Sequence, residues 1–396
     1  MTQASLSSRI TSINGGGSDG WGVFHRARRM IADGVPVIEL TIGEHDVRTD
    51  PLILDAMHAA ATGGHTGYAE IPGTRTLRQT VAERVAKRTG VPTTADNVLI
   101  TPGAQAALFA AHVATCDPGD TALFLDPYYA TYPGTIRSAG AIPQPVPTRA
   151  DNGFRPQAAD IAPYAGKARS LLINSPNNPT GVVYCRDTLQ DLGTLCQDRD
   201  MWLISDEVYD SQVWEGEHVS PRALPGMAER TLVLGSMSKS HAMTGSRCGW
   251  IVGPQEAVAH LITLSTHTNY GVPGFIQDAS VFAFGQGDAL EHAIAEPFRR
   301  RRALALRILG RQQAVRVIPP QGAMYLMLDI RATGMSGEAF ALELLDEHNI
   351  AVMPGESFGQ AAAGHLRVAM TVDDDRFAAA LETLCAFAAA RVRADA

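Results

Sequence analysis

Short apolar runs alternate with helical patterns from about residue 50 to 280, and this alternation constrains the fold more than any other feature of the sequence. Each run is continuously apolar, as expected for a strand that is buried on both faces. Strands of this kind, separated by helices, form a mostly parallel sheet with helices on both sides. The predicted strands are NVLIT, TALFLD, RSLLIN, MWLISDE, TLVLGS and GWIVG, beginning at residues 97, 121, 169, 201, 231 and 249.

The C-terminal part of the sequence predicts a second, smaller α+β domain. A long helical pattern covers about 286–312, and the strand-like runs GAMYLMLDI and GHLRVAM follow it. Further helices are expected at about 336–348 and 373–393. We therefore expect an α/β protein in three parts: an N-terminal arm with part of the small domain over 1–48, a large domain over 49–284 and a small domain over 285–396.

Composition and charge exclude several classes of protein. The net charge is −8 and no basic stretch is available to neutralise a phosphate backbone, so no nucleic-acid partner is expected. The four arginines at 299–302 are typical of a solvated helix face. The glycines at 15–17 follow no strand and open no helix, which argues against a dinucleotide site. No apolar run approaches the roughly 18 residues of a membrane span, and the first residues lack the apolar core of a signal peptide.

The cysteines indicate the compartment. There are five, an odd number, and no two form a CxxC pair. This pattern favours a reducing, cytoplasmic setting and argues against a zinc or other metal site.

One lysine stands out because lysine is rare in this chain. Of the 33 lysine and arginine residues, only three are lysine: Lys87, Lys167 and Lys239. Lys239 closely follows the predicted strand TLVLGS, between Ser236 and Arg247. A lysine amine can lose its proton and attack a carbonyl, whereas a guanidinium stays protonated. Small hydroxyls and an arginine also suit a phosphate. The alternative is a surface lysine in a loop.

Polar residues that follow other strands are further candidates, because ligands of such sheets gather at the carboxyl ends of strands. Asp206, with Tyr209 three residues later, could hold a protonated ring nitrogen or simply cap a helix. Asn178, in NSPNNPTG, could offer an amide to a phenolic oxygen or belong to a rigid turn. Tyr129 could stack on a planar ring or pack in the core.

Two more features complete the set. Gly103, Ala104 and Gln105 open an alanine-rich helix whose free N–H groups could bind an anion, although any helix start looks similar. Arg367 lies within an apolar strand and matches a carboxylate in bidentate fashion, unless it makes a structural salt bridge. Each signal is weak alone. Together they describe pyridoxal 5′-phosphate as cofactor and an amino acid as substrate.

Five segments are similar to the ordered motifs of the fold-type I, class I and II aminotransferases: YAEIPGTRTLR, NSPNNPTG, SDEVY, SMSKSHAMTGSRCGW and HLRVAM. The resemblance covers essentially the whole chain. It implies a transferase of amino acid metabolism that depends on pyridoxal phosphate and exchanges an amino group with a 2-oxo acid by ping-pong chemistry. It implies that Lys239 forms the Schiff base with the cofactor.

The resemblance also implies roles for the other candidates. Asp206 would hold the ring nitrogen, and Tyr209 would contact the ring oxygen. Tyr68 would reach the phosphate of a neighbouring subunit, which implies a homodimer with shared active sites. The implied cofactor-binding residues are Tyr68, Gly103, Ala104, Gln105, Tyr129, Asn178, Asp206, Tyr209, Ser236, Ser238, Lys239 and Arg247. The implied substrate-binding residues are Arg367, Gly43, Asn178 and Glu70.

The sequence departs from the family pattern at two positions. His45 stands where proline is common, and Ser246 stands where an aromatic residue is common, which leaves packing and loop shape near the site open. The resemblance favours arginine, or another basic or long amino acid, as donor and pyruvate as acceptor. A buried guanidinium needs an acid. Glu70 is the first candidate and Asp19 the second, although each could be a solvated loop acid.

The same residues allow three other kinds of protein. A C–S β-lyase, a decarboxylase or a racemase would keep the same cofactor residues. A regulatory cofactor sensor would carry a DNA-binding domain, but only about 40 residues precede the core, without basic or helix-turn-helix character. An inert scaffold would not need Lys239.

Overall fold

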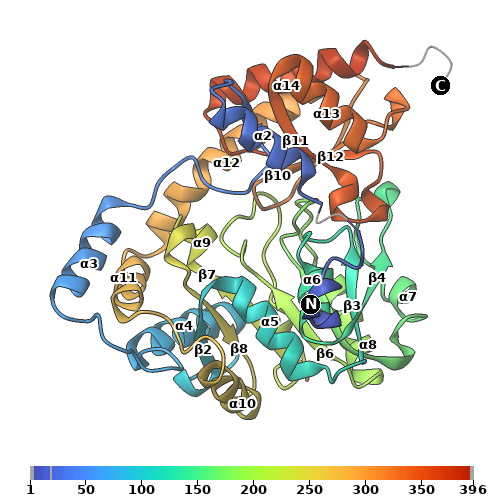
Figure 1. Ribbon diagram of the computed structural model, residues 1–396. Helices are drawn as coiled ribbons and strands as arrows, with labels where there is room; N and C mark the ends of the chain where they lie inside the picture. The colour runs from blue at the N-terminus through green and yellow to red at the C-terminus, as the bar shows by residue number, and fades with distance from the viewer. Residues whose placement is uncertain (1–3, 18–19, 393–396) are drawn as a thin grey trace.

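Two β-sheets organise the chain (Figure 1), and the computed structural model describes residues 4–17 and 20–392. The large sheet has seven strands in the order β2-β8-β7-β6-β5-β3-β4. Strands β4, β3, β5, β6 and β7 pair in parallel, and only β8 runs antiparallel to both of its neighbours. The predicted α/β class with a mostly parallel sheet is therefore confirmed. The strands of this sheet are β2 (Val98–Thr101), β3 (Thr121–Asp126), β4 (Ile142–Pro147), β5 (Ala168–Asn174), β6 (Trp202–Asp206), β7 (Thr231–Ser236) and β8 (Gly249–Val252).

The second sheet has five strands in the order β1-β11-β12-β10-β9. Its first strand comes from the N-terminal part of the chain and pairs in parallel with β11, while the other pairs are antiparallel. Residues far apart in the sequence thus share one sheet. The domain boundaries at 48 and 284 stay predictions. The strands are β1 (Ile38–Leu40), β9 (Arg316–Ile318), β10 (Tyr325–Asp329), β11 (Ile350–Pro354) and β12 (His365–Ala369).

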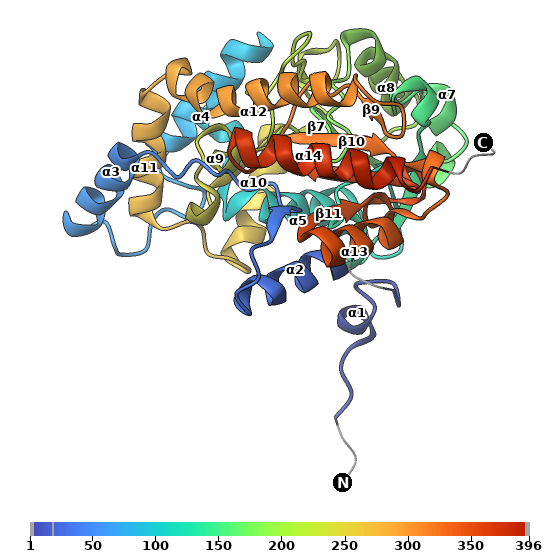
Figure 2. The same cartoon turned by 90° about the horizontal axis from the view of Figure 1, so that it is seen from above.

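Helices cover both sheets. Figure 1 shows them on both sides of the seven-stranded sheet, and Figure 2 shows α12, α13 and α14 beside the five-stranded one. The longest helix, α12, packs against α9 near the large sheet and against α14 near the small one, so it links the two layers. The helices are α1 (Ser8–Thr11), α2 (Gly22–Ala32), α3 (Pro51–Thr62), α4 (Arg75–Thr89), α5 (Gly103–Thr115), α6 (Tyr132–Ser138), α7 (Ala158–Ile161), α8 (Arg186–Asp198), α9 (Met237–Ser240), α10 (Gln255–Thr266), α11 (Gly274–Gly285), α12 (Asp288–Leu309), α13 (Gly337–His348) and α14 (Asp374–Ala389).

Capping residues in the sequence explain where several helices begin and end. The Asp50 carboxylate accepts a hydrogen bond from the N–H of Leu52, and a proline occupies the first position of α3. Thr74 caps α4 in the same way, and Gly90 ends that helix in the left-handed conformation that glycine adopts without strain. Local sequence therefore sets these boundaries before any tertiary contact forms.

Strand β4 is an element that the hydrophobic pattern missed. Its sequence, IPQPVP, contains three prolines, which cannot donate to a sheet ladder. The strand lies at the edge of the large sheet and pairs only with β3, so its other side needs no such donors. Proline is tolerated there for that reason, but it removes the pattern by which a strand is recognised.

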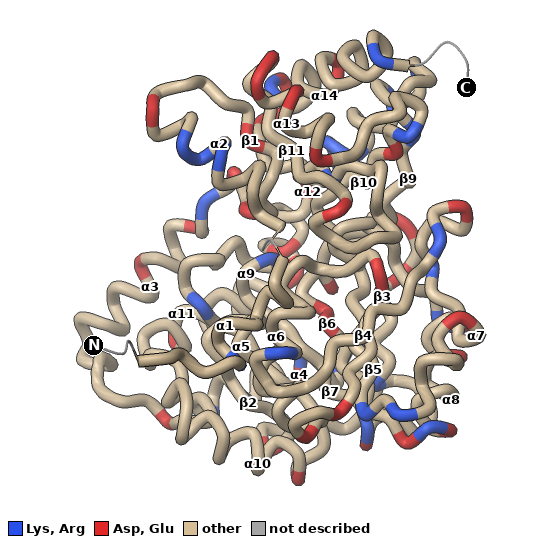
Figure 3. The backbone as a smooth tube through the Cα atoms, turned by 45° about the vertical axis from the view of Figure 1, so that its right-hand side comes forward, with Lys and Arg blue, Asp and Glu red and all other residues tan. Residues whose placement is uncertain are grey.

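The arginine run in α12 corrects a prediction. Arg299 and Arg300 are about half exposed, with 54% of each side chain accessible. The prediction of a solvated face is wrong for the other two arginines, since the Arg302 side chain is 12% exposed and Arg301 is only 3% exposed. The Arg301 guanidinium binds Asp46 with two nitrogens, reaches Asp374 at 3.0 Å through Nε, and donates to the carbonyl of Met370. Elsewhere acidic and basic residues are interspersed around both sheets (Figure 3).

We predict that Arg301→Met lowers the free energy of unfolding by about 3 kcal/mol. Removing one partner of a buried pair costs roughly 3–5 kcal/mol, and partial exposure of the two acids reduces that loss. The matched control is Arg300→Met, which removes an exposed arginine from the same Asp374 and should cost less than about 1 kcal/mol. Urea denaturation measures both, and equal losses would contradict the structural role of Arg301.

Candidate active site

A cavity of about 270 Å³ opens where β5, β6 and β7 end and α5 begins. Asn174, Asp206 and Ser236 are the last residues of these three strands, and all three line the cavity. Side chains from the five-stranded sheet close the opposite wall. Of the residues predicted from the sequence, those that line this pocket are Gly43, Ala104, Gln105, Tyr129, Asn178, Asp206, Tyr209, Ser236, Ser238, Lys239, Arg247 and Arg367.

Lys239 lies in the short helix α9, which follows β7 without a loop. Its Nζ atom donates a hydrogen bond to the carbonyl of Gly43. Burial lowers the pKa of Lys239 to about 8; Glu44 opposes this effect, while the positive charges of Arg367 and Arg247 add to it. The alternative of a surface lysine is therefore wrong. An amine with this pKa is uncharged at neutral pH in a far larger fraction of molecules than an ordinary lysine, which favours its action as a nucleophile or base.

Asp206 ends β6 and is buried. The hydroxyl of Tyr132 donates to its Oδ2 at 2.7 Å, and the N–H of Val208 donates to Oδ1 at 3.4 Å. Burial raises the pKa of Asp206 to about 6, and these two hydrogen bonds oppose that rise. A turn follows Asp206 rather than a helix, so the N-cap alternative is wrong. A buried carboxylate of this kind is stabilised by any cation or protonated nitrogen that enters the pocket.

Tyr209 and Asn178 meet on one wall of the pocket. The hydroxyl of Tyr209 lies 2.9 Å from that of Tyr325, and the Asn178 amide nitrogen donates to Tyr325 at 3.4 Å. Burial raises the pKa of Tyr209 well above its ordinary value, so the hydroxyl keeps its proton. Asn178 also belongs to a turn with two cis prolines, so the turn alternative holds, and it is compatible with a place in the pocket wall.

Arg367 is 1% exposed, yet its hydrogen-bond acceptors among the described residues are neutral. Its guanidinium lies between the rings of Tyr325 and Phe358, at 4.5 and 4.3 Å from their centroids. Nη1 donates to Asn178 Oδ1 at 3.0 Å and Nη2 to the carbonyl of Thr41, while the buried Nε has no acceptor. The structural salt bridge is thus not found. A buried guanidinium with an unpaired N–H is suited to a ligand carboxylate.

The opposite end of the pocket is built for an anion. Helix α5 begins at Gly103 with φ of +76°, and a Cβ atom there would lie 2.3 Å from Arg247 Nη2. A Cβ on Gly249 would lie 2.8 Å from the N atom of Ala104, so the helix start packs directly on β8. Ser236 Oγ donates to Ser238 Oγ at 2.9 Å. The helix N-terminus, hydroxyls and arginine together offer N–H and O–H donors and positive charge at one place.

These residues fit pyridoxal phosphate. The chemistry of the donor set matches each part of the cofactor: donors for the phosphate, a carboxylate for the ring nitrogen and an amine for the aldehyde. Because Gly103 and Gly249 have no side chains, Arg247 can lie against the start of α5, and that helix start can lie against β8. The unpaired Arg367 Nε, at the other end, is left for the carboxylate of a substrate.

Three predicted residues do not line the pocket of this chain: Gly103, at the start of α5, and Tyr68 and Glu70. Tyr68 is 94% exposed and contacts Tyr270 edge-on, and Glu70 is exposed as well. Asp19 lies outside the described residues. A second cavity of about 1020 Å³ adjoins the pocket, with Trp21, Gln105 and Arg247 lining both.

The two departures from the family pattern have different settings. His45 packs edge-on against Phe298, at 5.2 Å between ring centroids, and both of its ring nitrogens are buried without a hydrogen-bond partner. Burial lowers the pKa of His45 to about 3, so the imidazole is neutral. Ser246 lies in the turn before Arg247, which adopts a left-handed conformation.

The pocket residues that sequence reasoning missed include Trp21, Glu44, Tyr132 and Tyr325. Tyr132 and Tyr325 touch predicted residues only through tertiary contacts, and no local pattern distinguishes them from core tyrosines. Glu44 adjoins Gly43 in the sequence, and that position was the available signal. Its Oε1 accepts a hydrogen bond from Thr244 at 3.0 Å.

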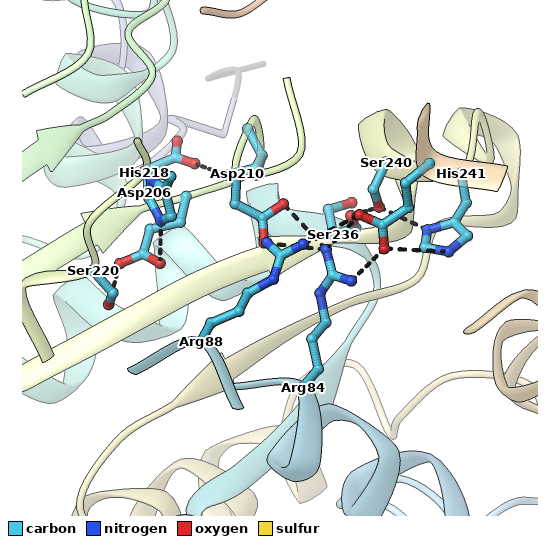
Figure 4. Close-up of polar contacts among 12 residues, drawn as sticks. Arg84, Arg88, Asp206, Asp210, His218, Ser220, Ser236, Ser240 and His241 are labelled. Atoms are coloured by element: carbon cyan, nitrogen blue, oxygen red, sulfur yellow. Dashed lines mark hydrogen bonds and ion pairs between the residues drawn. The ribbon is translucent and has the colours of Figure 1, made fainter. Parts of the chain in front are cut away.

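A network of charged residues holds the site from behind (Figure 4). Arg84 and Arg88, from α4, bind Asp210, which directly follows Tyr209. Both arginines also bind Glu291 of α12. Their positions are therefore tied to the turn that carries the tyrosine.

A second part of this network lies behind Asp206. The next residue, Glu207, accepts a hydrogen bond from Ser220 at 2.7 Å and lies 3.0 Å from His218 Nε2. Burial alone would lower the pKa of His218, but the charge and hydrogen bond of Glu207 outweigh it and raise that pKa. The turn after β6 is thus fixed by paired charges.

No group of three or more His, Cys, Asp or Glu side chains among the described residues could hold a metal ion. No helix within residues 4–17 and 20–392 is both long and apolar enough to cross a membrane.

Comparison with known proteins gives a consistent picture. The family model for aminotransferase class I and II matches residues 35–384. The arginine–pyruvate transaminase AruH of Pseudomonas aeruginosa is 42% identical over 91% of this chain and 92% of its own length. The aspartate/prephenate aminotransferase of Thermus thermophilus is 34% identical over 90% and 92%. The solved structure of Thermus thermophilus aspartate aminotransferase with maleate superposes with a TM-score of 0.91, at 32% identity, over 97% of this chain and 100% of that one.

We predict that the Lys239 amine reacts at lower pH than the other lysines. In protein freed of any bound aldehyde, labelling with pyridoxal and borohydride should reach half its maximum rate near pH 8, because only the unprotonated amine attacks. Peptide mapping separates Lys239 from the exposed Lys87, which serves as the internal comparison. Identical pH profiles for the two lysines would contradict the effect of burial.

Proposed function

The chain belongs to the class I and II aminotransferases, and on that premise we propose that it transfers the amino group of a basic L-amino acid, arginine first, to pyruvate. The enzyme depends on pyridoxal phosphate, as this family does. The single observation that carries the residue assignments is that the amine of Lys239, the carboxylate of Asp206 and the guanidinium of Arg367 line one pocket. The name of the Pseudomonas relative supports the donor and acceptor.

Each part of the cofactor has a proposed partner. Lys239 would bind its aldehyde carbon covalently, Asp206 would pair with the ring nitrogen, and Tyr209 and Asn178 would contact the ring oxygen. Tyr129 would pack against the ring. The phosphate is held by Gly103, Ala104, Gln105, Ser236, Ser238 and Arg247. Arg367 binds the α-carboxylate of the substrate, next to Gly43 and Asn178.

When bound, pyridoxal phosphate supplies an aldehyde that condenses with amines and a protonated ring that accepts the electrons of a broken bond. Lys239, whose Nζ the incoming amino group would displace, would take the proton from the substrate Cα and would deliver it to the carbon of the cofactor that had been the aldehyde. Arg367 fixes the carboxylate so that the Cα–H bond faces this amine. Asp206, held by Tyr132 and Val208, keeps its negative charge at the ring nitrogen. The net reaction exchanges the amino group of one acid for the carbonyl oxygen of another, in two half-reactions.

A lyase of the same fold is the alternative reaction, and it is not favoured, because the relatives that match over most of the chain are aminotransferases. Product analysis distinguishes the two. An aminotransferase forms alanine from pyruvate at the expense of the donor, whereas a β-lyase releases pyruvate and ammonia without an acceptor.

We further propose a cytoplasmic, reducing location. All five cysteines are free, and three of the four buried thiols have a pKa raised to between about 11 and 12 by burial, which keeps them protonated.

We predict that borohydride reduction of the holoenzyme places the pyridoxyl group on Lys239. Lys239→Arg should abolish alanine formation from pyruvate, because a guanidinium can neither attack the aldehyde nor take the Cα proton. Mass spectrometry of peptides and an alanine assay check the two parts. Label on Lys87 or Lys167 in the wild type would remove the assignment.

The proposed donor requires an acid that binds the guanidinium at the end of the arginine side chain. Glu70 is exposed and two residues from Tyr68, so it serves this role only from a neighbouring subunit. Glu44 is the exposed acid that lines the pocket of the same chain. We propose that Glu70 binds the guanidinium of the donor, and Glu44 is the acid with which its effect is compared.

We predict that Glu70→Gln lowers kcat/KM for arginine about 10- to 150-fold and leaves methionine nearly unchanged. The loss corresponds to a charge-assisted contact of roughly 1.5–3 kcal/mol, which methionine does not make. Glu44→Gln is the matched control and should affect both donors alike. If Glu44→Gln lowers kcat/KM for arginine alone, Glu44 rather than Glu70 binds the guanidinium. If the wild type does not turn over arginine, the donor assignment is wrong and the aminotransferase assignment stands.

We propose that the active unit is a homodimer in which Tyr68 of one subunit reaches the phosphate site of the other. Support comes from the 94% exposure of Tyr68 and from the cavity of about 1020 Å³ beside the pocket.

We predict a sedimentation mass of about twice 42.2 kDa for the wild type and weaker cofactor retention in Tyr68→Phe. A fully active monomer would contradict this arrangement.

A further inference from the structure

Tyr325 has no role in the assignments above, yet it lies at the centre of the polar wall. It is the first residue of β10, 2% exposed, and lines the pocket. Its hydroxyl lies 2.9 Å from that of Tyr209 and accepts from the Asn178 amide at 3.4 Å. It therefore contacts both residues that are proposed to meet the ring oxygen of the cofactor.

The direction of these hydrogen bonds follows from the groups that can only donate. Arg367 has no acceptor atom, so the Asn178 oxygen must face it, at 3.0 Å from Nη1. The NH₂ side of Asn178 then faces Tyr325, whose oxygen accepts. The proton of Tyr325 is left with the Tyr209 oxygen as its acceptor, at 2.9 Å. If Tyr209 donated instead, the Tyr325 proton would lack an acceptor among the contacts of the described residues.

We propose that Tyr325 is a positioning residue for Tyr209: by donating to the Tyr209 oxygen, it leaves the Tyr209 proton directed into the pocket, toward the ring oxygen of the cofactor. This rests on the proposed role of Tyr209. A hydroxyl that accepts one hydrogen bond becomes a stronger donor in the next, so the chain from Arg367 through Asn178 and Tyr325 also strengthens Tyr209 as a donor. The ionisable groups that face Tyr325 are those of Arg367, Tyr129 and Tyr209.

The structure also shows how to test the hydroxyl alone. The ring of Tyr325 packs on the Arg367 guanidinium, and its hydroxyl approaches Gly43 so closely that a Cβ there would lie 1.8 Å from it. Tyr325→Phe keeps the ring and its packing and removes only the oxygen. Tyr184→Phe is the matched control, because Tyr184 is 2% exposed as well but does not line the pocket.

The experiment is a spectroscopic pH titration of the holoenzyme, which follows the absorbance of the cofactor bound to Lys239. A weaker donor at the ring oxygen leaves more negative charge near the linking nitrogen, which then keeps its proton to higher pH. Tyr325→Phe should raise the midpoint by roughly half to one pH unit, a 3- to 10-fold change in the dissociation constant. Tyr184→Phe should leave it unchanged.

A double-mutant cycle decides whether the effect passes through Tyr209. In a Tyr209→Phe background, Tyr325→Phe should shift the midpoint further by less than about 0.2 units. An undiminished shift in that background, or no shift in the single variant, would overturn the positioning role while leaving the aminotransferase assignment in place. Failure to find any cofactor on Lys239 would overturn both.

Discussion

The buried guanidinium of Arg367 is the constraint on which the rest of the site depends. A charge in the interior is costly unless it is paired, and this one is stabilised by two aromatic rings and neutral oxygens rather than by an acid. Its Nε has no acceptor among the described residues, and a bound carboxylate would supply one. One of the two rings belongs to Tyr325, whose hydroxyl in turn contacts Tyr209. The residue proposed to bind the substrate carboxylate and the residue proposed to donate to the cofactor thus share one support.

Charges behind the pocket fix the segments that carry its reactive groups. Glu207 and Asp210 flank Val208 and Tyr209 in the turn after β6, and their partners come from α4 and from the loop that carries His218 (Figure 4). Arg301 does the same for the segment after β1, since it joins Asp46 to α12 and α14. Buried paired charges of this kind specify one arrangement, because an alternative arrangement would leave an ion unpaired.

The sequence predicted the large sheet well and its edge poorly. Strands β3, β5, β6 and β7 are continuously apolar because both faces are covered, and that pattern is local. Strand β4 escaped notice because its prolines are tolerated only at an edge, a position that tertiary pairing decides. Arg301 was misjudged for a similar reason: four consecutive arginines look alike in a sequence, and helix packing alone decides which of them is buried.

The sequence by itself identified the candidate residues of the site. Lys239, Asp206 and Asn178 were chosen from their residue types and because they follow or end strands of a parallel sheet, whose carboxyl ends lie together, whereas Arg367 was chosen as a charge within an apolar strand. Only the tertiary structure decided how these groups are held and tuned. The lowered pKa of Lys239, the hydrogen bond of Tyr132 to Asp206 and the contacts of Tyr325 depend on burial and on distances between residues remote in sequence, which no local pattern encodes.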